Sequence, residues 1–256
     1  MTFVTLTTDF GKNNYNIASL KGAILSTHSE SQLIDISNEI NNFDIIEAAF
    51  MLYNSYKFYP KNTVHIMSVN SYYSKRVRLL LLKKEDYYFI APDNGIISLL
   101  FDELEMNDIR YVEYGKTTGD LYTTIAELVA QCQQEENFEN IGQRVLSINK
   151  RITLKPVVSA NTIRVTVMFI DKFGNAILNV TKDLFTSTVG DKPFKLYYSP
   201  KDYIDQIQNK YSDVPFGDEL LIFNSAEHLE IAVNMGNANT DLGIMKDATL
   251  QIVYYS

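Results

Sequence analysis

The first half of the chain alternates short strand-like runs with amphipathic helical segments. β-Branched residues dominate residues 3–8, and apolar side chains follow at helical spacing over residues 15–27. Strand-like residues 32–36, a helical run over 43–56 and a strand-like run over 63–69 continue the pattern. Apolar periods that change from two to about 3.6 and back predict strands connected by helices. This alternation favours an α/β domain with a mostly parallel central sheet and helices packed on it.

The rest of this half contains one reversal of direction. Residues 77–83 and 87–91 pair naturally as a hairpin about Lys84-Glu85-Asp86. Turn residues Pro92-Asp93-Asn94-Gly95 follow. Further elements are then expected, namely a helix over 96–104, a strand over 109–113 and a helix over 124–134.

Beyond residue 149 the helical signal largely disappears. Short strand-like runs separated by glycines cover residues 162–170, 176–180, 194–197, 219–223, 229–234 and 249–254. One helix is expected near residues 201–210. The sequence therefore predicts an α/β N-terminal domain over 1–155 and a small all-β barrel over 156–256.

Charge and composition exclude several functions. The formal net charge of −8 argues against a nucleic-acid partner, which requires clustered Lys and Arg, and against an anionic membrane surface. The single cysteine, Cys132, allows no intrachain disulfide, and no His, Asp or Glu pair has convincing metal-site spacing. The first residues lack the basic and apolar regions of a signal peptide, so a cytoplasmic protein is expected.

An acid ends the first strand. Asp9 follows the strand-like run and precedes Phe10 and Gly11. In open α/β sheets a ligand binds outside the C-terminal ends of the strands, where a carboxylate accepts hydrogen bonds from vicinal hydroxyls such as those of a ribose. The alternative is that Asp9 only ends the strand or caps the next helix.

Small, amide and acidic residues gather at the ends of four predicted strands. The clusters are Thr7–Gly11, Ala91–Gly95, Asp171–Asn175 and Phe223–Ser225 continuing through Leu229–Ala238. Each one alone is compatible with a tight turn. Together they predict a polar pocket lined by backbone for an uncharged or zwitterionic ligand.

In this order and spacing, the four clusters resemble the S-adenosylmethionine hydroxide adenosyltransferases and the related fluorinases and chlorinases. Leu33–Ser37 and Phe43–Phe50 also look like the second strand and helix of that family. The resemblance covers nearly the whole chain. It implies an α/β domain, a C-terminal β-barrel and a homotrimer that binds S-adenosylmethionine between the N-domain of one subunit and the C-domain of the next.

The resemblance also implies roles for particular residues. Asp9 would hold the ribose hydroxyls, Asn175 and Asp171 the amino-acid end, and Ser225 with the backbone of Val233 and Asn234 the opposite wall. The full set of implied ligand-binding residues is Asp9, Phe10, Asp171, Phe173, Asn175, Phe223, Ser225, Val233 and Asn234.

The chain departs from the family at its water-activating Asp-Arg-His triad. Asn70 stands at the acid position, and Val77 stands at the arginine position between Arg76 and Arg78. Thr117 replaces the histidine, and Asp120 is kept. An amide cannot ionise, a valine cannot donate and a threonine is a poor base, so ordinary water activation is in doubt.

Two hypotheses follow. In the first, the chain cleaves S-adenosylmethionine, its adenosyl ligand, to adenosine and methionine, or transfers the adenosyl group to another nucleophile, with no further cofactor. In the second, it is a degenerate relative that binds an adenosyl ligand or a partner without turnover. The catalytic positions under the first hypothesis are Asn70, Arg76, Arg78 and Thr117. His65 is expected to be a packed strand residue and not a base.

Overall fold

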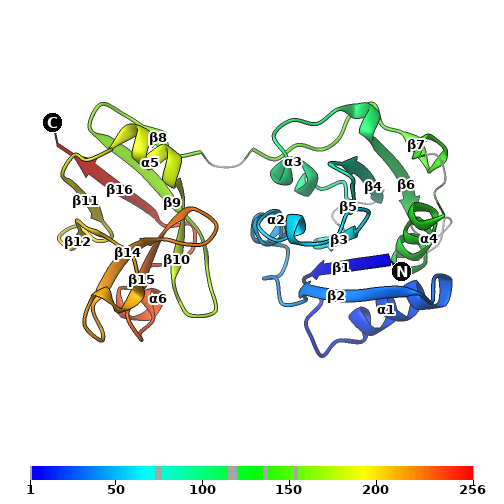
Figure 1. The fold of residues 1–256 in the computed structure, drawn as a ribbon, viewed down its shortest axis with the longest axis horizontal. Coiled ribbons are helices and arrows are strands. Elements are labelled where there is room, and N and C mark those ends of the chain that lie inside the picture. The colour runs from blue at the N-terminus through cyan, green and yellow to red at the C-terminus, as the bar shows by residue number, and fades with distance from the viewer. Residues whose placement is uncertain (1, 73–76, 115–119, 135–137, 153–154, 256) are drawn as a thin grey trace. The chain divides into compact units, whose positions relative to one another are not determined.

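The computed structural model describes residues 2–72, 77–114, 120–134, 138–152 and 155–255, and it divides the chain into two compact units, each with its own sheet (Figure 1). The units are Met1–Thr153 and Leu154–Ser256. Arg76 and Thr117 lie outside the described residues.

The N-terminal unit contains a seven-stranded sheet in the order β2-β1-β3-β5-β4-β6-β7 among the residues described. Its elements are β1 (Thr2–Thr8), α1 (Tyr15–Thr27), β2 (Ser31–Ser37), α2 (Ile45–Tyr53), β3 (Val64–Ser68), β4 (Val77–Lys84), β5 (Tyr87–Pro92), α3 (Ile96–Leu100), β6 (Ile109–Tyr114), α4 (Leu121–Gln133) and β7 (Gln143–Arg144).

This sheet is mixed, which corrects the expectation of a mostly parallel one. The pairs β2–β1, β1–β3 and β3–β5 are parallel, whereas β4 runs antiparallel to both β5 and β6, and β7 to β6. The cause is the hairpin between β4 and β5, which was predicted correctly. Glu85 and Asp86 both have positive φ, as a tight hairpin turn of this kind requires.

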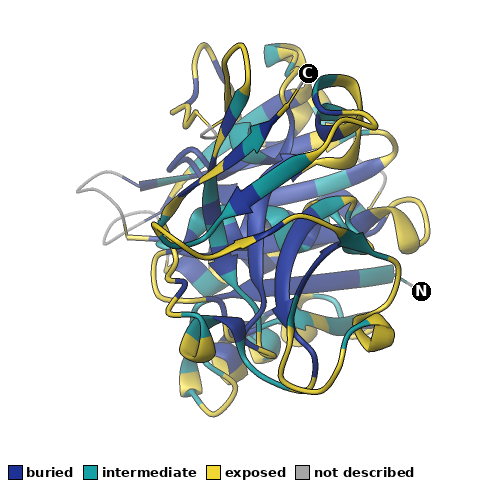
Figure 2. Ribbon diagram, turned by 90° about the vertical axis from the view of Figure 1, so that its left-hand side faces the viewer, coloured by how far each residue is buried: buried dark blue, intermediate teal, exposed yellow. Residues whose placement is uncertain are grey.

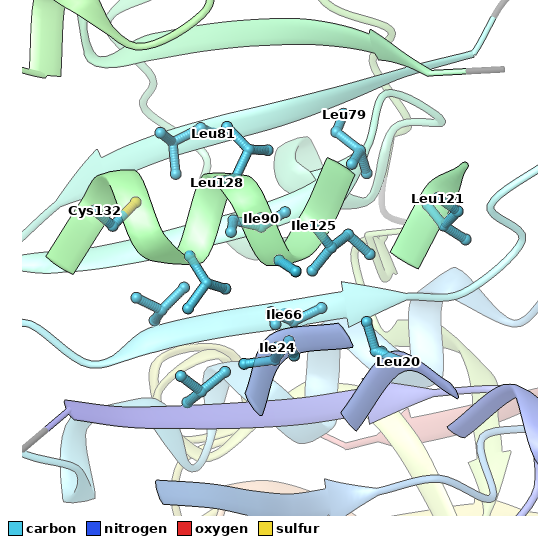
Figure 3. Close-up of a cluster of buried hydrophobic side chains, with 14 of the residues drawn as sticks. Leu20, Ile24, Ile66, Leu79, Leu81, Ile90, Leu121, Ile125, Leu128 and Cys132 are labelled. Atoms are coloured by element: carbon cyan, nitrogen blue, oxygen red, sulfur yellow. The ribbon is translucent and has the colours of Figure 1, made fainter. Parts of the chain in front are cut away.

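Helices cover both faces of the N-terminal sheet. On one face, α1 and α4 pack on apolar residues of β1, β3, β4 and β5, as Figure 3 shows for Leu20, Ile24, Ile66 and Leu128. On the other face, α2 and α3 pack on a second cluster that includes Phe89 and Leu82. Each fully buried large apolar side chain contributes roughly 1.5–3 kcal/mol. These two layers fix the strand ends that carry the candidate site.

Two predicted helices are shorter than expected. The helix predicted over 43–56 begins at Ile45 because Asp44 caps it by accepting a hydrogen bond from the Glu47 N–H. The helix predicted over 96–104 ends at Leu100, where Phe101 turns to extended backbone.

The described part of the C-terminal unit forms a nine-stranded sheet in the order β12-β11-β16-β9-β10-β15-β14-β13, with β8 added beside β9. Its elements are β8 (Val157–Val158), β9 (Thr162–Ile170), β10 (Ala176–Thr181), α5 (Lys182–Thr188), β11 (Phe194–Tyr197), β12 (Tyr203–Ile204), β13 (Ile207–Gln208), β14 (Glu219–Phe223), β15 (His228–Val233), α6 (Ala238–Asp241) and β16 (Thr249–Tyr254). The pairings among the described residues form an open path, so they do not establish the closed barrel that was expected.

The predicted helix over 201–210 is wrong. Tyr203–Ile204 and Ile207–Gln208 are instead the short strands β12 and β13. The Ser199 hydroxyl binds the Asp202 carboxylate and accepts from the Asp202 N–H, which forms a turn and not a first helical turn. The sequence analysis also missed α5, which Thr181 caps through the Leu184 N–H.

Burial follows the sheets. Figure 2 shows strands largely dark blue and loops largely yellow. Among the residues described, no helix is both long enough and apolar enough to cross a bilayer.

Candidate functional site

Three neighbouring strands of the N-terminal unit end in polar residues. β1 leads into Asp9, β3 into Asn70 and β5 into Asp93 and Asn94. These strands are parallel neighbours, and Thr8 lies opposite Ser68 in their register. Their C-terminal ends therefore meet at one edge of the sheet, where ligands bind in open α/β folds.

Asp9 is held by backbone amides. Its Oδ2 accepts hydrogen bonds from the N–H groups of Phe43 and Asn70, both at 3.1 Å. Both bonds reach the same oxygen, and among the described residues no hydrogen bond reaches Oδ1. Two amide donors fix the orientation of the carboxylate. The arrangement supplies a fixed acceptor at the strand end.

Asn94 braces the loop that carries Asn70. The Asn94 amide nitrogen donates to the carbonyls of Val69 at 2.9 Å and Asn70 at 3.2 Å, and its Oδ1 accepts from the Ile96 N–H. Asn94 is only 6% exposed. Asn70 itself has a positive φ of 50°, which turns its N–H toward Asp9. The turn motif after β5 thus holds the partner of Asp9 in place.

Arg78 is committed to a structural partner. Its guanidinium forms an ion pair with Asp93, with Nε 2.7 Å from Oδ2, and it donates to the Ser147 carbonyl at 2.9 Å. Asp93 is fully buried and also accepts from the Asn149 N–H at 2.8 Å. The pair fastens residues 147–149 to β4 and β5. Arg78 therefore acts here as a structural cation.

Val77, at the position of the family's arginine, lies in the core. It faces Tyr114 across β4 and β6 and belongs to the apolar cluster beneath α1 and α4. An arginine at this position would bury a cation among apolar side chains, which is costly without a partner. The loss of the family arginine is thus built into the packing of this sheet.

Aromatic side chains surround the loop after β3. Tyr72 is exposed and meets Tyr114 edge to face at 6.1 Å between ring centroids, and Tyr114 donates to the Ser71 carbonyl. Phe10 packs edge to face on Tyr122 at 6.2 Å. Although much of the Tyr72 side chain is exposed, partial desolvation of its hydroxyl and the charge of Asp120 raise the pKa of that hydroxyl above its usual value of 10.0, and it is protonated at neutral pH. A protonated tyrosine can donate a hydrogen bond to a ligand here.

In the C-terminal unit, the Asp171 carboxylate shapes the turn between β9 and β10. Its Oδ1 accepts from the N–H groups of Phe173 at 2.9 Å and Asn175 at 2.8 Å, and Oδ2 accepts from the Asn175 amide at 3.1 Å. Gly174 has a φ of 85°, and a side chain there would collide with Asn237. Asn175 is buried, whereas Phe173 is 76% exposed. Asp171 and Asn175 thus form one rigid turn that presents the Phe173 ring to solvent.

The turn between β14 and β15 carries Phe223 and Ser225. Phe223 is half-buried and packs edge to face on Phe185 at 5.7 Å, whereas Ser225 is exposed. The intervening Asn224 accepts at Oδ1 from the N–H groups of Ala226 at 3.0 Å and His228 at 3.1 Å. The serine hydroxyl is therefore displayed on an internally bonded turn.

Val233 and Asn234 end β15 as structural residues. Val233 belongs to the core of the C-terminal unit. The Asn234 amide donates to the Val214 carbonyl at 2.7 Å, and its backbone N–H donates to the Asp218 carbonyl at 3.0 Å. The Asn234 carbonyl in turn accepts from the Gly217 N–H at 2.9 Å, so the backbone here is part of the local turn structure.

Sequence reasoning missed two polar residues of this unit, Glu230 and Tyr211. Glu230 is 3% exposed and binds the Tyr211 hydroxyl at 2.8 Å and the Asn224 amide at 3.1 Å. The available signal was a charged residue inside the apolar strand Leu229–Val233, which predicts a buried acid with hydrogen-bonding partners. His65, by contrast, is fully buried in β3, and the prediction that it is a packed strand residue is confirmed.

Models of known protein families match most of both units of the chain. A family model of the S-adenosylmethionine hydroxide adenosyltransferase N-terminal domain matches residues 4–142, and the corresponding C-terminal domain model matches residues 165–251. A protein of Methanocaldococcus jannaschii named (R)-S-adenosyl-L-methionine hydrolase is 27% identical over 98% of this chain and 95% of its own length.

Two solved structures share the fold along its length. An uncharacterized conserved protein from Thermotoga maritima has a TM-score of 0.82 and 25% identity, and covers 98% of this chain and 100% of its own. A conserved hypothetical protein from Thermus thermophilus has a TM-score of 0.74 and 21% identity over 100% of both chains. The N-terminal domain model alone spans more than half of the sequence. The chain belongs to the S-adenosylmethionine hydroxide adenosyltransferase family.

Proposed function

We propose that the chain binds S-adenosylmethionine and cleaves it to adenosine and methionine. Water attacks the 5′ carbon, the bond from that carbon to sulfur breaks with its electron pair going to sulfur, and the proton of the water is released. The observation that carries the proposal is the match of both domain models of this family to one chain. The relative named as a hydrolase supports the direction of the chemistry.

The proposed ligand contacts follow the geometry of each unit. Asp9 Oδ1 accepts from the ribose hydroxyls, because Oδ2 is already occupied by two backbone amides. Asn175, oriented by Asp171, and the Ser225 hydroxyl bind the amino-acid end. The rings of Phe10, Phe173 and Phe223 and the backbone of Val233 and Asn234 complete the proposed contacts.

Cleavage of S-adenosylmethionine requires little assistance from a general base. A sulfonium is already a good leaving group, so rate enhancement comes mainly from an aligned nucleophile in a partly desolvated site. In this proposal the Asn70 side chain orients the water, and Arg76 and Thr117 are the other catalytic positions that the family resemblance suggests. Arg78 contributes through its ion pair with Asp93 and not by contact with water.

A second candidate function is binding of an adenosyl ligand without turnover. It is favoured by the commitment of Arg78 to Asp93 and by the buried position of Val77. Neither residue is placed to replace the cation of the family triad. Ligand binding through Asp9 does not depend on either of them.

The proposal extends to assembly and location. We propose a homotrimer in the cytoplasm, a closed barrel in the C-terminal unit, and activity without a cofactor, nucleic acid or membrane partner. Light scattering coupled to size exclusion tests the trimer, and a monomer at micromolar concentration would contradict it.

The deciding experiment measures adenosine release from S-adenosylmethionine by the purified chain, together with calorimetric binding of the same compound. Release that Asp9→Ala abolishes supports hydrolysis. Binding without release supports the second function. Neither binding nor release would refute both.

A further inference from the structure

Glu230 lies on the face of β15 that points away from the main core of the C-terminal unit. Its neighbours Leu229 and Ile231 belong to that core, whereas Ala232 belongs to a small separate cluster with Leu220 and Ile222. Because side chains alternate along a strand, Glu230 shares the second face with Ala232. It is nevertheless 3% exposed, so a carboxylate is buried there.

The partners of this carboxylate are neutral. The Tyr211 hydroxyl donates to Oε1 at 2.8 Å and the Asn224 amide donates to Oε2 at 3.1 Å. Burial raises the pKa of Glu230, the two hydrogen bonds oppose that rise, and the negative charge of Asp171 adds to it. Burying an acid without a cation is unfavourable, so an acceptor at this position requires an explanation in the structure.

The explanation lies in Asn224. Its Oδ1 accepts from the N–H groups of Ala226 and His228, and its own N–H donates to the His228 carbonyl at 3.0 Å. The amide nitrogen, at the other end of the side chain, is held by Glu230. With both ends bonded, the amide cannot rotate without breaking hydrogen bonds. The hydrogen bond between Asn224 and Glu230 therefore helps to fix the turn that displays Ser225.

We propose that Glu230 is a positioning residue of the adenosyl-ligand site, which acts by supplying the acceptor that orients Asn224 and so the Phe223–Ser225 turn. This inference rests on the proposed function for the ligand and on the hydrogen bonds above for the geometry. The requirement is for an acceptor, not for a charge. A glutamine keeps one acceptor for Asn224 and can donate to the Tyr211 oxygen, whereas a methionine of similar length offers neither.

The test compares Glu230→Met, Glu230→Gln and, as a matched control, Glu227→Met at an exposed carboxylate of the same turn. Amide hydrogen exchange of Ala226 and His228 reports the turn, and calorimetric titration with S-adenosylmethionine reports the site. In Glu230→Met we expect exchange of both amides to rise on the order of 10-fold and affinity to fall on the order of 10-fold. In Glu230→Gln the amide exchange and the affinity should both stay close to the wild-type values, and Glu227→Met should change neither.

The two readouts separate the inference from the proposed function. Unchanged exchange in Glu230→Met overturns the positioning role. Faster exchange with unchanged affinity shows that the turn does not serve the ligand and also overturns the inference. Failure of the wild-type chain to bind S-adenosylmethionine refutes the proposed function, and with it the ligand role of Glu230. If Glu230→Met does not fold, Asn224→Asp keeps an acceptor for the Ala226 and His228 N–H groups but removes the donor to Glu230, and it is judged by the same two measurements.

Discussion

Asp93 in the N-terminal unit and Glu230 in the C-terminal unit are both buried carboxylates, but their partners differ. Asp93 is fully buried against the Arg78 guanidinium, whereas the partners of Glu230 among the described residues are a hydroxyl and an amide. The first arrangement compensates charge with charge, and removal of the cation leaves an isolated buried anion. The second supplies an acceptor and tolerates a neutral substitute. Similar burial thus serves a structural clamp in one unit and the orientation of a turn in the other.

The largest expected effect comes from the cost of protonating His65 inside the N-terminal unit. It is fully buried, its Nδ1 lies 2.7 Å from the Thr5 hydroxyl, and the rings of Tyr56, Tyr59 and Phe89 surround it. Burial lowers the pKa of His65 from 6.5 to about 3.

The unfolded chain therefore binds more protons than the folded one between pH 6.5 and about 3. Stability of this unit should be unaffected by His65 above that window and fall as the pH drops through it, by up to about 4 kcal/mol. Urea unfolding between pH 7 and 4, followed by hydrogen exchange in β1 and β3, measures the slope. His65→Phe should flatten it and the half-exposed control His28→Gln should not; an unchanged slope in His65→Phe contradicts the prediction.

Removal of the Arg78 cation is expected to have the next largest effect. Arg78→Met leaves Asp93 buried without its counter-charge and should lower the free energy of unfolding by about 3 kcal/mol. Denaturant unfolding measures the loss. Adding Asp93→Asn should recover part of it, because the uncompensated charge is then gone. Strictly additive losses in the double variant would show that the two side chains do not act as a pair.

Asp9 differs from both Asp93 and Glu230, because backbone amides hold its carboxylate. Asp9→Asn keeps the shape of the side chain but removes the charge that strengthens hydrogen bonds to ligand hydroxyls. Affinity for S-adenosylmethionine should fall roughly 30-fold, equivalent to about 2 kcal/mol, in calorimetric titration. Asp35→Asn, at an acid paired with Lys21 in β2, serves as the control. Equal affinities for wild type and Asp9→Asn would leave Asp9 as a structural residue of the strand end.

The smallest effect concerns the pH dependence of Glu230, and its sign is opposite to that of His65. The pKa of Glu230 is raised in the folded chain, so the folded state binds more protons than the unfolded state from pH 4.5 up to the raised value. Its contribution should therefore decline as the pH rises through this window. Glu230→Gln should remove that decline in unfolding monitored by exchange in β14 and β15. An unchanged decline in Glu230→Gln would assign the titration to another group.

The strand ends show how far sequence reasoning reaches. The alternation of periods located β1, β2, β3 and the hairpin. Strands such as β1 and β3 are buried along most of their length, so they appear in the sequence as short runs of apolar and β-branched residues. The same reasoning failed at residues 201–210, where side-chain hydrogen bonds of Ser199 and Asp202 set a turn that no apolar period reveals. It also overestimated the parallel character of the sheet, because the direction of β4 depends on a local turn with two positive φ angles.

The sequence by itself determined the main order of elements in the N-terminal unit, the polar residues at the strand ends and the family motifs, because these depend on local pattern and spacing. The tertiary structure decided which of those polar groups are already occupied. Only the structure shows that the Arg78 guanidinium is paired with Asp93 and that Glu230 is bonded to Asn224. Both assignments depend on contacts between residues far apart in the chain or on opposite sides of a turn. Such contacts form only when the sheets bring side chains within hydrogen-bonding distance, and no local pattern specifies them.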